Sequence, residues 1–388
     1  MSEHALKSVL RPIETAKGLP NEYYISDDLY ALERKAVFHK TWAALAFESD
    51  VPDAGSIFPV DFLGTPLLLV RSKDGALNVF QNTCRHRGMI LIDKPARLSG
   101  PIRCPYHSWC YSHDGDLVRT PSVGGLNIDT HEAVKPDELS LFKIRSFIWH
   151  GVVFVNLSGD APEFKEVHAN LMERWAEFDR PYHLGGAVSQ FDMTLDTNWK
   201  LAVENFCESY HLPWIHPELN KISPIDVHYN IENQSEYSGQ GSRNYNQLVG
   251  DDGRRFPDFK GVSSKWDKEA EYISFFPNVL LGVHRDHAYA MLLMPQGPEQ
   301  TLERVALFYA NEDIDSPEWQ GMLTENARIW QGVFAEDIGV VEGMQRGRHG
   351  DMFDGGKFSP VMDGPTHIFH KWVANRMLAA HGDIEKTA

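Results

Sequence analysis

The spacing of hydrophobic and polar positions changes along the chain. Within a polar N-terminal stretch, apolar residues recur at helical intervals from Asp27 to Lys40, so residues 1–43 are expected to be helical. From about Phe47, short β-branched or aromatic runs alternate with turn pairs. Strands are expected at Phe58–Phe62, Pro66–Arg71, Ala76–Gln81, Ile102–Tyr106 and Ile148–Asn156, with hairpin turns at Lys73-Asp74-Gly75 and His113-Asp114-Gly115.

Past Ser158 the pattern mixes helical and strand-like segments. Helices are expected from Glu163 to Phe178 and within Glu318–Arg346. Consecutive strands are expected at Tyr272–Phe276, Val279–Val283 and His287–Met294, with Pro295 ending the last one. Three parts are therefore expected: an N-terminal helical part at residues 1–43, a small β domain at 44–157, and a larger part of mixed helices and strands at 158–388.

Composition narrows the classes of function. The chain has 388 residues, 42% of them hydrophobic, which is enough for a substantial core. Its 54 acidic residues against 37 basic ones give a formal charge of -17, which opposes binding to nucleic acid or to anionic membranes. Residues 1–20 contain no continuous apolar segment, so a cytoplasmic protein is expected, in which Cys110 and Cys207 are ordinary thiols.

Two pairs of metal-ligating residues stand in turn-rich loops. One is Cys84-Arg85-His86 and the other is Cys104-Pro105-Tyr106-His107. Structural zinc sites usually group like ligands, Cys with Cys and His with His, whereas each loop here carries one of each. Two such loops can hold a two-iron cluster, with both thiolates on one iron and both imidazoles on the other. This is the Rieske [2Fe–2S] ligand set, and a structural zinc is the alternative.

A second group of ligand residues lies between Asn198 and His216. Asp196, Thr197 or Asn198 can cap a helix that Pro213 should end. On that helix Glu204, Glu208 and His211 would share one face, and His216 could turn back toward His211. The alternative is an amphipathic helix with solvated acids and surface histidines. Two histidines and one carboxylate on one face of the metal form the facial triad of non-heme iron oxygenases.

The missing carboxylate is expected on the later helix. Asp337 has Val333, Phe334, Val340 and Val341 as its helical neighbours, so it lies in an apolar stripe. A carboxylate there is costly unless it is paired or binds a metal. A buried salt bridge is the alternative for Asp337, and the neighbouring Glu336 is expected to be more exposed.

Together these motifs resemble the α subunit of a Rieske non-heme iron oxygenase over nearly the whole chain. The family's N-W-K…E-N…[DE]-x-x-H-x-x-x-x-H segment is matched from Asn198 to His216, and its E-D-x-x-x-x-E-x-x-Q stretch from Glu336 to Gln345. Ring-dihydroxylating members often have Asp where this chain has Glu208. This departure and the second stretch are closer to the carnitine and choline-type monooxygenase branch.

The resemblance implies an α+β fold, in which the Rieske domain is inserted into a catalytic domain of helices on an antiparallel sheet. It implies that Cys84, His86, Cys104 and His107 hold the [2Fe–2S] cluster, and that His211, His216 and Asp337 hold a mononuclear Fe(II). It also implies a head-to-tail homotrimer, in which Glu208 bridges a cluster histidine of one subunit, His86 or His107, to an iron ligand of the next.

Electrons should come from another protein, because no dinucleotide fingerprint accompanies these motifs. Gly239-Gln240-Gly241 lacks the third glycine and is expected to be a loop. A separate flavin-containing reductase, with or without a ferredoxin domain, would therefore oxidise NAD(P)H. Its electrons would pass through the Rieske cluster to the mononuclear iron.

Three hypotheses about the function remain open at this point. The first is a monooxygenase that hydroxylates or oxidatively demethylates a small substrate such as an alkylammonium compound. The second is a ring-hydroxylating oxygenase of an aromatic acid, and the third is a Rieske electron carrier or redox sensor. Aromatic side chains that face the iron could enclose a quaternary ammonium group or stack on an arene. The candidates for this role are Tyr210, Trp214, Tyr272, Phe275 and Tyr289.

Overall fold

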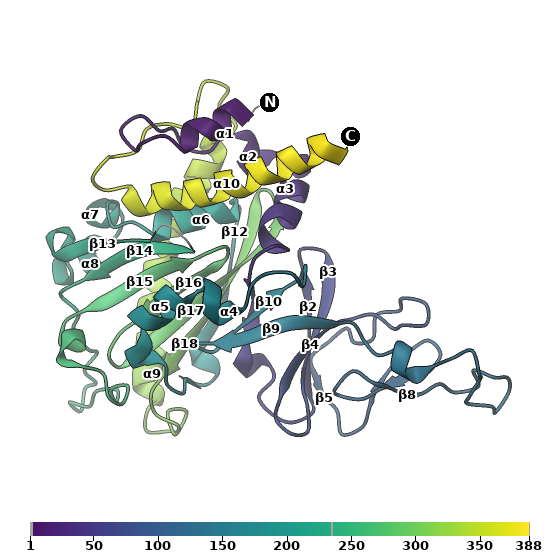
Figure 1. Cartoon of the computed structure of the whole chain (residues 1–388). Coiled ribbons are helices and arrows are strands. Elements are labelled where there is room, and N and C mark those ends of the chain that lie inside the picture. The colour runs from purple at the N-terminus through teal and green to yellow at the C-terminus, as the bar shows by residue number, and fades with distance from the viewer. Residues whose placement is uncertain (1–2, 234–235, 388) are drawn as a thin grey trace. The chain divides into compact units, whose positions relative to one another are not determined.

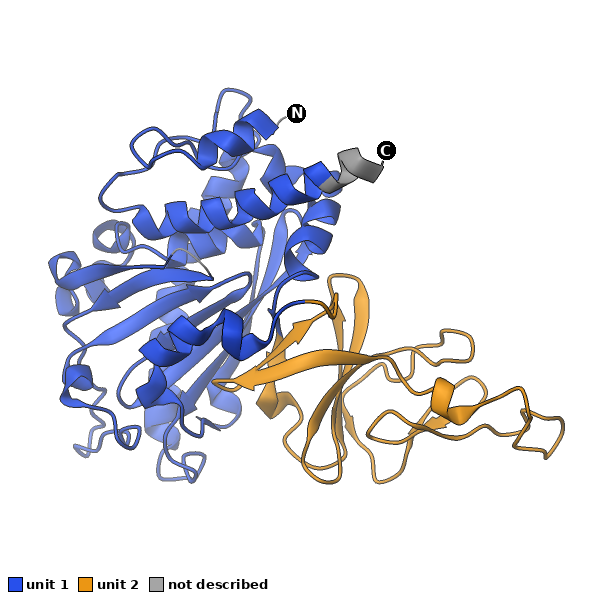
Figure 2. Cartoon of the chain, in the orientation of Figure 1, with its two compact units in different colours: residues 1–44, 161–388 blue, residues 45–160 orange. Residues whose placement is uncertain are grey.

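The computed structural model describes residues 3–233 and 236–387. The chain divides into two compact units, one of residues 1–44 and 161–388 and the other of residues 45–160 (Figure 2). The second unit corresponds to the segment expected as a β domain, residues 44–157. None of the described helices is both long enough and apolar enough to cross a membrane.

The unit of residues 45–160 is built on antiparallel strands. A seven-stranded sheet has the order β1-β10-β9-β4-β3-β2-β5, and β6-β7-β8 form a separate small sheet (Figure 1). The strands are β1 (Ala43–Phe47), β2 (Ser56–Phe62), β3 (Thr65–Arg71), β4 (Leu77–Gln81), β5 (Ala96–Arg97), β6 (Ile102–Arg103), β7 (Cys110–Tyr111), β8 (Leu117–Arg119), β9 (Lys143–Trp149) and β10 (Val152–Asn156).

Both expected hairpin turns are present, but two expected strands were wrong. Residues 148–156 are not one strand, because His150 and Gly151 both have positive φ, at 50° and 73°, and turn the chain between β9 and β10. Consecutive residues of this kind are typical of a tight hairpin turn. The strand expected at 102–106 stops at Arg103, since Cys104 already belongs to a hydrogen-bonded loop.

The other unit contains an eight-stranded antiparallel sheet in the order β11-β18-β17-β16-β15-β14-β13, and β12 also pairs with β18. The expected strands at 272–276, 279–283 and 287–294 correspond to β15, β16 and β17. The strands are β11 (His183–Leu184), β12 (Gln190–Leu195), β13 (His228–Glu232), β14 (Tyr237–Ser242), β15 (Ala270–Phe275), β16 (Val279–Val283), β17 (His287–Gly297) and β18 (Gln300–Tyr309).

Two expectations about this sheet were wrong. Pro295 does not end β17, which continues through a bulge to Gly297, because a bulge is one of the places where a strand tolerates proline. The Gly239-Gln240-Gly241 segment is part of the buried strand β14 rather than a loop. A Cβ on Gly239 would lie 2.1 Å from the Tyr272 carbonyl oxygen, so glycine lets the neighbouring strand approach closely.

Helices α6 (Trp199–Phe206), α9 (Gln320–Gly347) and α10 (Gly364–Thr387) are packed in the same unit as this sheet (Figure 1). Helix α6 contacts β15, β17, α9 and α10. The N-terminal part forms α1 (Glu3–Val9), α2 (Glu22–Ile25) and α3 (Asp27–Glu33), followed by a π-helical turn at Arg34–Phe38. The helix expected at 163–178 is broken into α4 (Phe164–Val167), α5 (Ala169–Arg174) and a 3-10 turn at Ala176–Phe178.

Candidate metal centres

The two loops expected to hold the Rieske cluster have the same backbone hydrogen bonds. The Cys84 amide donates to the Met89 carbonyl at 2.8 Å, and the Cys104 amide donates to the Trp109 carbonyl at 2.8 Å. Four residues after each cysteine, Gly88 and Ser108 take positive φ values of 73° and 59°. Two loops of equal geometry therefore present one cysteine each, which suits a ligand set contributed in two halves.

The four expected cluster ligands lie together at these loops. Both cysteines are buried, and burial is the main reason that the pKa of the Cys84 thiol is raised, with the nearby Cys104 thiol adding to the effect. The imidazole rings of His86 and His107 lie 4.7 Å apart, and the His86 ring stacks on Trp109. Nδ1 of His107 is buried and has no hydrogen-bond partner. An unpaired buried ring nitrogen is costly unless it binds a metal, so these residues fit a Rieske cluster.

The second ligand segment does not form the single helix expected from its sequence. Asn198 caps α6, since its side chain accepts a hydrogen bond from the Lys200 amide at 3.0 Å. The helix ends at Phe206, and Pro213 lies inside the first turn of α7 (Leu212–Ile215) instead of ending α6. Proline is well tolerated there because the first amides of a helix have no partner within it.

This break removes Glu204 from the face on which it was expected. The Glu204 carboxylate is buried, accepts a hydrogen bond from the Tyr24 hydroxyl at 2.5 Å and pairs with Arg348 and His370. Burial would raise the pKa of Glu204, but His370 and Arg348 outweigh it and lower the pKa to about 2. Glu204 therefore belongs to the packing of the N-terminal part and not to the metal site.

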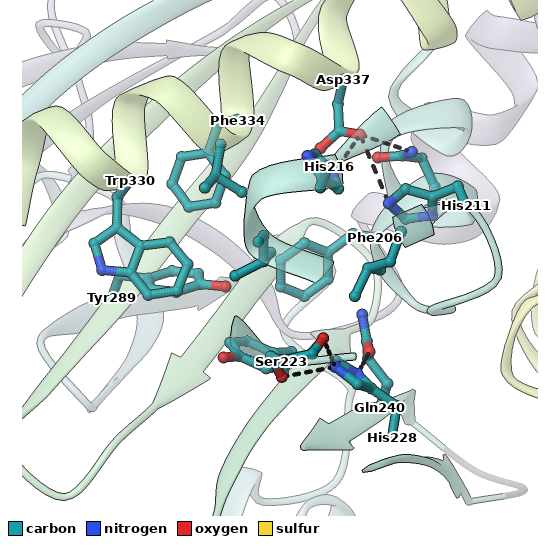
Figure 3. Close-up of a pocket in the computed structure, with 15 residues that line it drawn as sticks. Phe206, His211, His216, Ser223, His228, Gln240, Tyr289, Trp330, Phe334 and Asp337 are labelled. Carbon is teal, nitrogen blue, oxygen red and sulfur yellow. Dashed lines mark hydrogen bonds and ion pairs between the residues drawn. The ribbon is translucent and has the colours of Figure 1, made fainter. Parts of the chain in front are cut away.

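His211, His216 and Asp337 come together although they lie on separate elements. Nε2 of His216 is 3.1 Å and Nε2 of His211 is 3.7 Å from Oδ1 of Asp337. One donor atom from each residue lies within 4.8 Å of the others. In Figure 3 Asp337 points down from α9 toward both imidazoles. Two imidazoles and one carboxylate converging in this way fit a mononuclear Fe(II) site.

A carboxylate holds the outer nitrogen of each histidine. Nδ1 of His211 is 2.7 Å from Oε1 of Glu208, and Nδ1 of His216 is 2.7 Å from Oε2 of Glu336. Such contacts fix the imidazole tautomer and leave Nε2 free for a metal. Burial lowers the pKa of His216, but Asp337 and Glu336 together raise it above its ordinary value.

Glu336 is a site residue that the sequence interpretation missed. Its side chain is 44% exposed, as expected, yet it reaches His216. Asn205 was also missed, and it donates a hydrogen bond from Nδ2 to Oδ1 of Asp337 at 3.2 Å. Glu336 is adjacent to Asp337 and Asn205 is adjacent to Glu204, and both fall in the matched motifs. These motifs were the only available signal.

An apolar cavity of about 60 Å³ adjoins the triad (Figure 3). Of the five aromatic residues named as candidates for facing the iron, Tyr272 and Tyr289 line the cavity, whereas Tyr210, Trp214 and Phe275 do not. Trp214 is 69% exposed, and Phe275 packs on Phe164 and His168 instead. The remaining aromatic lining consists of Phe206, Trp330 and Phe334.

Polar groups on another wall of the cavity anchor the backbone beside Glu208. The Gln240 amide donates from Nε2 to the Glu208 carbonyl oxygen at 3.1 Å, so its Oε1 accepts from Nδ1 of His228 at 2.6 Å. Nε2 of His228 then faces the Ser223 hydroxyl at 3.0 Å. Burial lowers the pKa of His228 and keeps it neutral. The segment that had been expected to be a loop therefore helps to position the second ligand group.

Comparisons with known proteins agree with both metal centres. Residues 172–379 match the model of the ring hydroxylating alpha subunit (catalytic domain), and residues 41–132 match the Rieske [2Fe-2S] domain. The glycine betaine monooxygenase oxygenase subunit of Chromohalobacter salexigens is 25% identical, over 97% of this chain and 89% of that protein. The chloroplastic choline monooxygenase of Atriplex hortensis is 23% identical, over 94% and 79%.

A solved structure supports the same fold. The quaternary ammonium Rieske monooxygenase CntA in complex with L-carnitine is 20% identical, with a TM-score of 0.75 over 97% of this chain and 99% of that chain. The expected α+β fold and the family resemblance are confirmed. The match to a catalytic domain also goes against the electron-carrier reading. The chain therefore belongs to the family of ring-hydroxylating oxygenase α subunits, oxidoreductases that combine a Rieske [2Fe–2S] domain with a catalytic domain for mononuclear iron.

Proposed function

We propose that the chain is the terminal oxygenase component of a monooxygenase that hydroxylates or oxidatively demethylates an alkylammonium compound. The observation that carries the proposal is the aromatic wall beside the triad. The Tyr289 and Trp330 rings are 4.6 Å apart, and Phe334 lies 5.2 Å from Tyr289 and 5.6 Å from Trp330. Aromatic faces bind quaternary ammonium groups through cation–π attraction. The names of the relatives point to the same substrates.

In this proposal His211, His216 and Asp337 hold Fe(II), and Cys84, His86, Cys104 and His107 hold the cluster. When bound, the iron supplies the chemistry that reduces O2 with electrons received through the cluster. Glu208 and Glu336 keep the Nδ1 protons of the two histidines in place, and Asn205 orients the Asp337 carboxylate. The apolar cavity excludes water from the position beside the triad and leaves room for a small part of the substrate.

The overall reaction balances with two electrons and two protons for each O2. One oxygen atom enters a C–H bond beside the nitrogen, and the other leaves as water. A hydroxylated N-methyl group then breaks its C–N bond, which releases formaldehyde, a proton and the demethylated amine. A separate flavin-containing reductase would take the electrons from NAD(P)H and deliver them to the cluster.

A homotrimer is part of the same proposal. Glu208 already holds His211, and the same carboxylate would meet His86 or His107 of a neighbouring subunit in a head-to-tail arrangement. Exposed side chains beside both centres support it: Tyr210 and Trp214 next to His211, and Tyr106 and Met89 in the cluster loops. Apolar exposure of this kind is typical of surfaces that become buried on association.

The test is substrate-stimulated O2 uptake by the purified protein, loaded with iron and cluster and supplied with a surrogate reductase and NADH. Alkylammonium compounds and aromatic acids are compared, with mass analysis of the products. Release of formaldehyde or another aldehyde, coupled to uptake, supports the proposal. Hydroxylated arenes would replace it by the ring-hydroxylating reading. Metal analysis should give about three irons and two acid-labile sulfides per chain, whereas about two irons would indicate an electron carrier.

A further inference from the structure

The cavity beside the triad adjoins a second, larger cavity of about 280 Å³. The two share part of their walls, formed by Leu219, Ser223, Tyr272, Trp330 and Val333. Because the inner cavity holds only about 60 Å³, a substrate that presents one small group to the metal must place the rest of its atoms in the outer cavity. The lining of the outer cavity therefore selects the part of the substrate that is not oxidised.

The outer cavity offers no positive charge, and the inner one has only the iron that the triad would hold. No lysine or arginine is among the described residues that line them. Burial and the neighbouring His287 hold the pKa of His284 well below its ordinary value, so this ring is neutral. Nε2 of His287 accepts a hydrogen bond from the Trp330 indole N–H at 2.9 Å. An indole nitrogen only donates, so His287 is also neutral and carries its proton on Nδ1.

A buried carboxylate lies directly behind this wall. Asp286 is 0% exposed, and its Oδ1 accepts hydrogen bonds from the Tyr245 hydroxyl at 2.7 Å and from Nδ1 of His287 at 2.9 Å. Its Oδ2 has no partner within the described structure. The adjacent Arg285 pairs with Asp258 and Asp267 instead. Tyr245 stays protonated, because burial and the charge of Asp286 raise its pKa well above the ordinary value.

Neither hydrogen-bond partner of Asp286, Tyr245 or His287, therefore carries a positive charge that would neutralise the carboxylate. A buried carboxylate without a counter-charge is costly, and a cation bound in the adjoining cavity would offset part of that cost. Tyr245 is hydrogen-bonded to Asp286 and Trp330 to His287, and both line the outer cavity. Trp330 lines the inner cavity as well. A substrate carboxylate in the outer cavity, by contrast, would lie near a buried negative charge and would meet no cationic partner.

We propose that the substrate is a cation without a carboxylate, such as a trialkylammonium alcohol, and that Asp286 determines this specificity. The inference rests on the proposed function and narrows it. The onium group lies against the aromatic walls that the two cavities share, and Asp286 supplies the negative potential behind them. Zwitterions with a carboxylate, including glycine betaine, bind weakly.

Three probes of similar size separate the contributions. Choline carries a trimethylammonium group and a hydroxyl, glycine betaine replaces the hydroxymethyl group by a carboxylate, and 3,3-dimethylbutan-1-ol replaces the ammonium nitrogen by carbon. Calorimetric titration of the iron-loaded protein without O2 measures binding apart from turnover. Choline is expected to bind at least about tenfold more tightly than either of the other two probes.

Three variants test the assignment to Asp286 and to the outer cavity. Asp286→Asn keeps the shape of the side chain. It should weaken the binding of choline about tenfold and leave the binding of 3,3-dimethylbutan-1-ol unchanged. Ile222 lines the outer cavity and is 61% exposed, so it can be replaced without disturbing the core. Ile222→Arg should strengthen binding of glycine betaine, and Ile222→Gln, the uncharged control, should not.

The outcomes distinguish the inference from the proposed function. If glycine betaine binds as tightly as choline, or if Asp286→Asn affects choline and the neutral alcohol equally, the specificity inference is wrong although an alkylammonium oxygenase remains. If neither ammonium compound binds more tightly than the neutral alcohol, the proposed function itself fails.

Discussion

Replacing Glu336 by glutamine tests whether this exposed carboxylate tunes the metal site. Oε2 of Glu336 is 2.7 Å from Nδ1 of His216, while Nε2 of His216 faces Asp337. Loss of a carboxylate that holds a metal-ligating histidine typically lowers metal affinity about 10- to 100-fold. Because the Glu336 side chain is 44% exposed, solvent screens it. We therefore expect the lower end, about tenfold or 1.4 kcal/mol.

The assay is anaerobic competition for Fe(II) between the protein and a chelator of known affinity. Glu325→Gln is the matched control, since Glu325 lies on the same helix and pairs with Arg328 at the surface. The visible spectrum of the cluster and the free energy of unfolding should change little in either variant, because both positions are exposed.

The pH dependence gives a second check on Glu336. Glu336 helps to raise the pKa of His216 in the metal-free protein, so the metal must displace a proton more often at low pH in the wild type than in Glu336→Gln. The difference in affinity should therefore shrink as the pH falls from about 8 to about 6. Equal affinities of Glu336→Gln and the wild type at pH 8 would refute the reasoning.

Three further predictions concern other carboxylates. Glu208→Ala should leave both metal centres bound but stop electron transfer between them, measured as single-turnover oxidation of the reduced cluster; a near wild-type rate would contradict this. Lys200→Met should lower the free energy of unfolding by about 3–5 kcal/mol, since it leaves Glu33 buried without its 2.8 Å partner; adding Glu33→Gln should recover part of the loss in urea denaturation. The pKa of Glu204 is lowered from 4.5 to about 2, so its ionised carboxylate stabilises the fold at a pH above 4.5. This contribution disappears as the pH falls toward 2. The deficit of Glu204→Gln relative to the wild type should therefore be largest near pH 6 and shrink below pH 4.5; a constant deficit would show that the charge of Glu204 is not responsible.

The matched N-W-K motif illustrates how a sequence signature and its physical role differ. Asn198 caps α6, while Trp199 and Lys200 both bind the buried Glu33 carboxylate. A cap can be expected from the sequence because its hydrogen bond joins near neighbours. The partner of Lys200 could not be expected, because Glu33 is 167 residues away along the chain.

Local chemistry allowed the sequence by itself to determine much of this protein. Ligand types and their spacing predicted the two cluster loops and the histidine segment, and the apolar stripe around Asp337 marked a carboxylate that needed a partner. Runs of β-branched and aromatic residues located six strands, namely β2, β3, β4, β15, β16 and β17. The wrong expectations arose where a turn decided the outcome, as at His150 and Gly151, or where a helix ended early, as α6 does at Phe206.

Only the tertiary structure decided which carboxylates lie beside the histidines of the candidate metal site. Glu204 and Glu208 look equivalent in sequence, yet one pairs with Arg348 and His370 and the other with His211. Glu336 reaches His216 across 120 residues of sequence, and Asp286, Tyr245 and His287 meet behind the outer cavity. Such contacts depend on how distant elements pack, and packing is a property of the whole folded chain rather than of any local pattern.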